Sequence, residues 1–253
     1  MPKFRLLRRA LGWGAAFFAV TALVASFART PHHALHFDLP APRTLAHPLT
    51  LWATWYWTPS YISTHSPHDI PLKDEHEHFL GLRLPAEQFC HAAVQGSVRI
   101  DGKIYTFGGI GKQKMAPCEQ WRPDMPQAPY VLFSPSDSLY GEGDGPYSLV
   151  PYRSVAVDEK VIPLGTVLYI PRARGCWVTL PDGTCARHDG YFFAADNGYG
   201  VDRNHIDVFN GLSDQNPFPW VQSLRTATFA AYVVTDPAVR RRLMRLHLAG
   251  MAP

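Results

Sequence analysis

The chain has 253 residues with a formal net charge of +3, and its residues are 46% hydrophobic and 18% charged. This length suits one large domain or two small ones, and the composition excludes a coiled coil and wholesale disorder. A net charge this small, without a basic stripe interleaved with aromatic residues, also argues against nucleic-acid binding. The 23 prolines and 19 glycines indicate many turns and favour a loop-rich β fold.

The N-terminal segment combines positive charge with a long apolar run. Residues 10–28 are almost unbroken in their apolar character, and they follow the basic residues Lys3, Arg5, Arg8 and Arg9. Ser26 and Ala28 are small residues at the positions that a signal peptidase reads, so we predict that residues 1–28 are a signal peptide. The alternative is an uncleaved anchor in the inner membrane, since about 19 apolar residues span a bilayer. In both cases the rest of the chain is predicted to work in the periplasm or cell envelope.

Residues 29–50 are rich in proline, histidine and alanine, and they predict a linker or an extended arm across the surface. Residues 51–61 are dense in aromatic side chains and predict the first strand of a barrel. Most of these aromatic side chains are expected in the core. In the alternative, Trp55 and Trp57 project into a cleft and stack on sugar rings.

Residues 64–146 predict a small α+β lobe inserted into the barrel. Within it we expect a short helix over residues 86–94 and a hairpin that turns at Asp101 and Gly102. Residues 116–146 are rich in proline, glycine and serine, and they predict an irregular segment without helices or strands.

Histidine and acidic residues gather within residues 64–79, where prolines and polar groups favour a solvated loop. They offer no ligand set for a closed tetrahedral site, so neither a metal nor another cofactor is predicted. The alternative is a metal-dependent hydrolase that uses the acidic and histidine residues between Asp74 and His78. Such an enzyme would lose its activity to chelators.

The four cysteines predict two structural disulfides, because the compartment outside the cytoplasm is oxidising and no pair has metal-ligand spacing. Cys176 and Cys185 flank a hairpin turn and are predicted to pair across it. Cys90 and Cys118 then pair by elimination. A catalytic cysteine is the less favoured alternative.

From residue 147 the sequence returns to short apolar runs that predict strands, at residues 155–157, 166–170, 190–195, 206–209 and 226–234. A helix-like stretch is expected over residues 220–225. Asp236 predicts the N-cap of a C-terminal helix within residues 236–253, with Pro237 in its first turn. Its basic residues are expected on a solvated face, or alternatively on a face that attracts an anionic polymer or membrane surface: Arg240, Arg241, Arg242 and Arg245.

Carboxylates gather in the glycine-punctuated segment 194–211, which contains Asp196, Asp202 and Asp207, and Asp158 follows an earlier strand. Glycines beside a strand end let another chain approach closely, so these carboxylates indicate a cleft for a polar ligand. We interpret the cleft as a carbohydrate-processing site.

Five sequence blocks resemble the three-aspartate (3D) domain shared by the membrane-bound lytic murein transglycosylase A family and related cell-wall proteins. They are ATWYWTP at 53–59, AVDEKVIPLGTVLYIP at 156–171, AADNG at 194–198, HIDVFNG at 205–211 and ATFAAYVV at 227–234. The resemblance implies a mainly β fold, a six-stranded double-psi β-barrel over residues 51–235 interrupted by the insertion 64–146. It also implies cleavage of the glycan strands of peptidoglycan.

The resemblance places the family's three aspartates at Asp158, Asp196 and Asp207, and it assigns Asp207 as the catalytic acid/base. Asn197 and Tyr199 stand where the family usually has glycine and a lysine-containing turn, so Tyr199 narrows the cleft or adds a stacking surface. These two residues are expected to bind substrate together with His205, Trp55 and Trp57.

A lytic transglycosylase needs only one carboxyl group, which must stay protonated near neutral pH, and burial of Asp207 between apolar neighbours would raise its pKa. Asp196 would then orient substrate or tune Asp207, and Asp158 would help to hold the site or, with nearly equal weight, cap a turn. The rival hypothesis is a non-catalytic peptidoglycan-binding protein on the same barrel.

Overall fold

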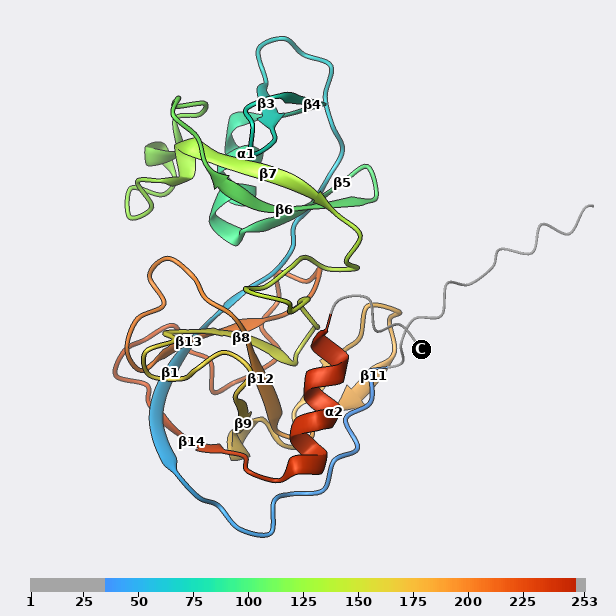
Figure 1. The fold of residues 1–253 in the computed structure, drawn as a ribbon, viewed down its shortest axis with the longest axis vertical. Helices are drawn as coiled ribbons and strands as arrows, with labels where there is room; N and C mark the ends of the chain where they lie inside the picture. The colour runs from blue at the N-terminus through green and yellow to red at the C-terminus, as the bar shows by residue number, and fades with distance from the viewer. Residues whose placement is uncertain (1–34, 249–253) are drawn as a thin grey trace, which may run out of the picture. The chain divides into compact units, whose positions relative to one another are not determined.

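The structure is a computed structural model that describes residues 35–248, so the predicted signal peptide or anchor lies outside the described residues. Six strands close a barrel in the order β1-β13-β8-β12-β9-β14 (Figure 1). They are β1 (Pro48–Tyr56), β8 (Ser154–Val157), β9 (Val167–Tyr169), β12 (Tyr191–Asp196), β13 (His205–Phe209) and β14 (Phe229–Val233). The predicted mainly β, six-stranded barrel is confirmed, and its double-psi connectivity stays a prediction.

Strict alternation of side chains on β1 and β13 decides what faces the barrel interior. Leu51 and Ala53 on β1, with Ile206 and Val208 on β13, join the main hydrophobic core. The intervening residues therefore point outward, and the parallel pairing of the two strands sets Trp52, Thr54 and Tyr56 beside His205, Asp207 and Phe209. A slip of one residue would bring Asp207 into the core, so burial fixes this register.

A second sheet lies between β1 and β8 in the chain, with the order β2-β5-β6-β7. Its strands are β2 (Ser60–Tyr61), β5 (Ser97–Ile100), β6 (Lys103–Ile110) and β7 (Val131–Ser136), accompanied by helix α1 (Ala86–Gln95) and the hairpin β3 (Ile70–Lys73) and β4 (Phe79–Leu84). This lobe has its own core, which includes Phe89 from the predicted helix. Asp101 and Gly102 turn the β5–β6 hairpin with φ values of 50° and 84°, as the sequence predicts.

Three local predictions were wrong. Residues 116–146 contain β7 as well as the short 3₁₀ turns Cys118–Gln120 and Ala128–Tyr130, and the polar residues 64–79 include β3. In β7 the apolar run of Val131, Leu132 and Phe133 is buried, although proline and serine dominate its surroundings. Residues 220–225 form no helix, because Trp220 and Val221 bury their side chains in the barrel core from irregular backbone.

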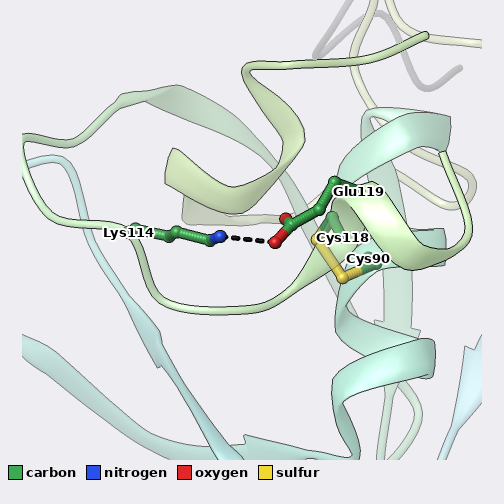
Figure 2. Close-up of a disulfide and its surroundings, with 4 residues drawn as sticks. All are labelled: Cys90, Lys114, Cys118 and Glu119. Atoms are coloured by element: carbon green, nitrogen blue, oxygen red, sulfur yellow. Dashed lines mark hydrogen bonds and ion pairs between the residues drawn. A yellow bond between two sulfur atoms is a disulfide. The ribbon is translucent and has the colours of Figure 1, made fainter. Parts of the chain in front are cut away.

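The lobe contains the disulfide Cys90–Cys118, which joins α1 to the 3₁₀ turn that also carries Glu119 (Figure 2). This predicted bond is confirmed. The other predicted bond is wrong, since Cys176 and Cys185 are free thiols. The hairpin of β10 (Trp177–Thr179) and β11 (Cys185–Arg187) pairs Cys185 with Thr179. Cys176 is therefore three positions away along the strand, roughly 10 Å, which is beyond the reach of a disulfide.

Replacing both Cys90 and Cys118 by serine is expected to destabilise the protein by about 3–4 kcal/mol, because the bond closes a loop over a sequence separation of 28. Urea denaturation of the oxidised protein and of the variant measures this difference. The matched control replaces Cys176 and Cys185 by serine and should change stability by less than about 1 kcal/mol. Equal effects of the two double variants would contradict the assignment.

The arm before β1 is extended and lies on the barrel. A buried ion pair holds it there: Arg153 Nη1 lies 2.6 Å from Asp189 Oδ1, while Arg153 Nη2 donates to the carbonyl of His36. The Leu39 amide donates to Asp189 Oδ2 at 3.1 Å. Residues 35–40 are thus tied to the barrel wall, and β1 begins at Pro48.

Helix α2 (Pro237–His247) packs against β12, as Figure 1 also shows in red. The predicted cap is present, since Asp236 Oδ1 accepts from the amides of Ala238 and Val239. Leu243 faces the barrel and is buried. Among residues 35–248, no helix has both the length and the apolar character that a membrane crossing requires.

Candidate active site

Asp196 and Asp207 come together because both flank the same strand. Asp196 on β12 and Asp207 on β13 each pair with Ala156 on β8, which lies between these two strands. Two strand spacings separate their Cα atoms by on the order of 10 Å, close enough for side chains on one face to interact. The predicted pair of carboxylates is therefore assembled by the barrel itself.

A β-bulge brings Asp196 to the outer face. Ala194 points into the barrel core, so regular alternation would return Asp196 to the interior two residues later. The register shifts between Ala194 and Asp196, and the Tyr56 hydroxyl on the outer face of β1 donates to Asp196 Oδ2 at 2.9 Å. Bulges re-aim side chains in this way, often next to active sites.

Asp207 is held by a chain of hydrogen bonds. The Thr54 hydroxyl donates to Asp207 Oδ1 at 2.8 Å and also lies 2.8 Å from His205 Nε2. His205 Nδ1 lies 3.1 Å from the carbonyl oxygen of Gly200, and its ring stacks on Trp52 with centroids 3.7 Å apart. Threonine and histidine thereby fix the carboxyl group on the outer face of the barrel.

The positions of the protons in this chain of hydrogen bonds link Asp207 to His205. The Gly200 carbonyl can only accept, so Nδ1 carries a proton, and burial lowers the pKa of His205 and keeps its ring neutral. Nε2 must then accept from Thr54, whose oxygen is left to accept from a protonated Asp207. When Asp207 ionises, the Thr54 hydroxyl turns to donate to the carboxylate and gives up its hydrogen bond to His205 Nε2.

Both carboxyl groups have strongly raised pKa values. Desolvation by the surrounding protein raises the pKa of Asp207 to about 7, against the opposing effects of the Thr54 hydrogen bond and the positive charge of Arg122. Desolvation likewise raises the pKa of Asp196 to about 7, and the negative charges of Asp144 and Asp207 add to this effect. Carboxyl groups poised near neutral pH are suited to general acid–base chemistry.

Asp158 differs from Asp196 and Asp207, because its hydrogen bonds are to backbone amides of turns and its pKa is lowered. Its Oδ1 accepts from the Lys160 amide and its Oδ2 from the Arg203 amide, at 3.0 and 2.8 Å, and these bonds lower its pKa. It therefore organises the turn after β8 and fastens the loop of residues 197–204 to it. This geometry favours the turn-capping alternative over direct participation.

The other residues that were predicted to bind substrate lie in different surroundings. Asn197 Nδ2 donates to Asp144 and Glu159 and lines a cavity of about 380 Å³ beside the 197–204 loop, whereas Tyr199 is 61% exposed. Trp55 packs against the barrel core and donates from Nε1 to the Asp214 carbonyl. These positions make Asn197 part of the loop scaffold and leave the ring of Tyr199 open to solvent.

Trp57 lies at the end of β1, where its ring meets His91 of α1 edge-on with centroids 4.9 Å apart. His91 borders a second cavity of about 470 Å³, whose other lining residues are Tyr61, Glu87, Gln88, Val94, Trp121 and Arg122. Of the two predicted tryptophans, Trp57 is therefore the one that lies close to a cavity.

Sequence reasoning missed Thr54 and Tyr56, which hold the two carboxyl groups. The available signal was the alternation of β1, since a strand that buries Leu51 and Ala53 must turn Thr54 and Tyr56 to the other face. The run of aromatic residues concealed this alternation.

The histidine-rich segment forms a turn between β3 and β4. The amides of His76 and His78 donate to Asp74 Oδ1 at 2.9 and 2.8 Å. Within the described part of the chain, no three histidine, cysteine or acidic side chains are grouped so as to hold a metal ion.

Replacing Thr54 by valine is expected to raise the pKa of Asp207 further, by about one unit, because the charge-assisted hydrogen bond to the carboxylate is stronger than the bond to the protonated acid and both are lost. The alkaline limb of the pH–activity profile should move upward by the same amount. Thr50→Val, at an exposed position of the same strand, should leave the profile unchanged. A downward shift for Thr54→Val would contradict the hydrogen-bond geometry.

The raised pKa of Asp196 makes stability depend on pH. Since the folded state holds this proton more tightly than the unfolded state, stability should fall as pH rises from about 4 through about 7. Asp196→Asn removes the ionisation and should raise Tm at pH 8 by a few degrees, with no gain at pH 4. Asp158→Asn is the control, and its effect on Tm at pH 8 should have the opposite sign. The lowered pKa of Asp158 stabilises the fold above about pH 4, and this variant loses that stabilisation. Thermal melts at the two pH values test both signs.

Comparison with known proteins adds a family likeness. Residues 153–220 match the sequence model of the 3D domain, and this range contains Asp158, Asp196 and Asp207. A comparison with curated protein sequences gives no match.

Several solved structures are similar at low identity. Escherichia coli MltA with bound chitohexaose is 17% identical, with a TM-score of 0.47 over 73% of this chain and 71% of that one. A membrane-bound lytic murein transglycosylase from Agrobacterium tumefaciens is 15% identical, with a TM-score of 0.48 over 78% of each chain. The lytic transglycosylase LtgG of Burkholderia pseudomallei is 20% identical, with a TM-score of 0.36 over 73% of this chain and 71% of that one. The predicted resemblance to the 3D domain is confirmed over residues 153–220.

Proposed function

We propose that this protein is a peptidoglycan lytic transglycosylase that cleaves the β-1,4 bond between MurNAc and GlcNAc. The observation that carries the proposal is the Asp207 carboxyl group, held by Thr54 on the outer face of the barrel with its pKa raised to about 7. A protein that only binds glycan has no use for an acid that is still about half protonated at neutral pH. The match of residues 153–220 to the 3D domain supports a cell-wall substrate.

In the proposed reaction, protonated Asp207 donates its proton to the glycosidic oxygen as the C1–O bond breaks. The same carboxylate then takes the proton from the C6 hydroxyl of the muramoyl residue, and this oxygen attacks C1 within the same sugar. The product carries a 1,6-anhydro ring, no water is consumed, and Asp207 ends in its starting protonation state. One carboxyl group therefore suffices, whereas hydrolysis uses two.

Asp196 supports this cycle in the proposal. Because its pKa and that of Asp207 are both raised and their charges interact, the two groups share protons as a pair. The negative charge of Asp207 adds to the raised pKa of Asp196, and Asp196 orients the substrate beside Asp207. Thr54 and His205 act as positioning residues for Asp207.

We further propose that the protein works on the periplasmic side of the envelope, following export directed by residues 1–28. The glycan ligand of E. coli MltA in its solved structure is chitohexaose, a soluble oligosaccharide that serves here as a binding probe.

Digestion of purified peptidoglycan followed by mass spectrometry tests the function. Anhydro-muramoyl products are lighter than hydrolysis products by the mass of one water, about 18 Da, and should appear with the unmodified protein. Reducing-end products would instead indicate hydrolysis by both carboxyl groups. Retained binding to peptidoglycan without any product would indicate a binding protein, and each of these two results would overturn the proposal.

A further inference from the structure

Helix α2 carries four arginines within six residues, and all of them are exposed. Leu243 and His247 mark the buried side of the helix. Since residues four apart share a helix face, Arg241 and Arg245 form a stripe on the side turned away from the barrel. α2 is therefore amphipathic, with Arg241 and Arg245 on its outer face.

The charges of this stripe are not neutralised within the fold. Arg242 pairs with Asp38 of the arm, whereas Arg240, Arg241 and Arg245 have no salt bridge to any of residues 35–248. Arg241 and Arg245, unpaired and adjacent on the exposed helix face, are suited to an anionic surface.

The arm indicates which anionic surface lies within reach. Asp38 is the tenth residue after Ala28, the last residue of the long apolar stretch, and ten residue steps span at most about 36 Å. If that stretch remains in the membrane, the contact between Asp38 and Arg242 keeps α2 within this distance of the lipid headgroups.

We propose that the outer stripe of α2, formed by Arg241 and Arg245, docks on anionic phospholipid headgroups of the membrane in which residues 10–28 are retained. The contact between Asp38 and Arg242 positions α2 for this docking. The inference concerns the orientation of the protein and does not depend on its catalytic activity. Each arginine near such a surface is expected to strengthen the contact about fivefold at low salt, and the effect should fade within a Debye length as salt is added.

Arginine footprinting of the full chain, reconstituted into vesicles, tests the proposal. Phenylglyoxal modification is followed by mass spectrometry in vesicles of phosphatidylcholine alone and with one part phosphatidylglycerol to two parts phosphatidylcholine. Arg241 and Arg245 should react at least fivefold more slowly in the anionic vesicles. Arg203, in the loop after β12, should react equally in both. Equal rates for Arg241 in both vesicles, or equal slowing of Arg203, would overturn the proposal.

Two variants of the same net charge sharpen this test. In R241Q/R245Q the remaining Arg240 should react at the same rate in both vesicle types, whereas in R187Q/R203Q the difference at Arg241 and Arg245 should persist. Slowing by soluble polyphosphate with none by anionic vesicles would indicate a soluble polyanion as the partner, and this would also overturn the proposal.

Discussion

Replacing Asp207 by asparagine is expected to lower the turnover number on peptidoglycan by about a thousandfold or more. Asparagine keeps the size of the side chain and a carbonyl oxygen for the Thr54 hydroxyl, which donates to Asp207 Oδ1 in the structure. It removes the proton that the leaving glycosidic oxygen needs, and with it the base for the C6 hydroxyl. Release of soluble anhydro-muramoyl fragments at pH 6, where the acid is mostly protonated, measures the loss.

The matched control for this variant is Asp202→Asn. Asp202 lies in the neighbouring loop with a side chain 48% exposed, 3.7 Å from Arg203 and 4.0 Å from Arg225. It has the same chemical nature as Asp207 but no buried environment, so turnover should change by less than about twofold. Binding of chitohexaose should survive in both variants. An Asp207→Asn variant with more than about a tenth of the original turnover would contradict the assignment of the acid.

The second large effect is structural. Asp189→Leu leaves Arg153 as an unpaired charge in a site where both side chains are only 2% exposed, and such a change costs about 3–5 kcal/mol. The midpoint of thermal unfolding should fall by roughly 10 °C or more. The loss should also release the arm, because Asp189 Oδ2 accepts from Leu39 and Arg153 donates to His36. Calorimetry gives the first effect, and faster proteolysis of residues 35–47 gives the second.

An exposed ion pair on the same arm provides the comparison. Asp38 and Arg242 have side chains 64% and 45% exposed, so Asp38→Asn should change stability by less than about 1 kcal/mol. Replacing both members of the buried pair, with Arg153→Met and Asp189→Leu, should restore much of the loss of the single variant. If Asp189→Leu were as mild as Asp38→Asn, the buried pair would not be what secures the arm.

The sequence predicted those parts of the fold that depend on local pattern. Alternating and continuous apolar runs indicated the barrel strands, and Asp101 with Gly102 indicated a hairpin because both adopt positive φ. The N-cap of α2 was likewise predictable from Asp236 and Pro237. Asp196 and Asp207 were found as candidates from their positions at or near strand ends.

Features that depend on pairing between segments distant in the sequence could not be predicted from the sequence alone. The bulge that turns Asp196 outward arises from its pairing with β8, and Thr54 reaches Asp207 because β1 and β13, more than 140 residues apart in sequence, lie side by side. The failed disulfide has the same origin, since the register of β10 and β11, rather than the turn between them, decides which residues face Cys185.

The most direct test is a measurement of the protonation of Asp207. Carbon-13 NMR of protein labelled at the aspartate carboxyl carbons follows each group between pH 3 and pH 9, and the signal missing from Asp207→Asn identifies the residue. A midpoint near pH 7 is predicted, because desolvation raises the pKa to about 7. A midpoint near pH 4 would mean that Asp207 is ionised at neutral pH, and the proposed acid would then be contradicted.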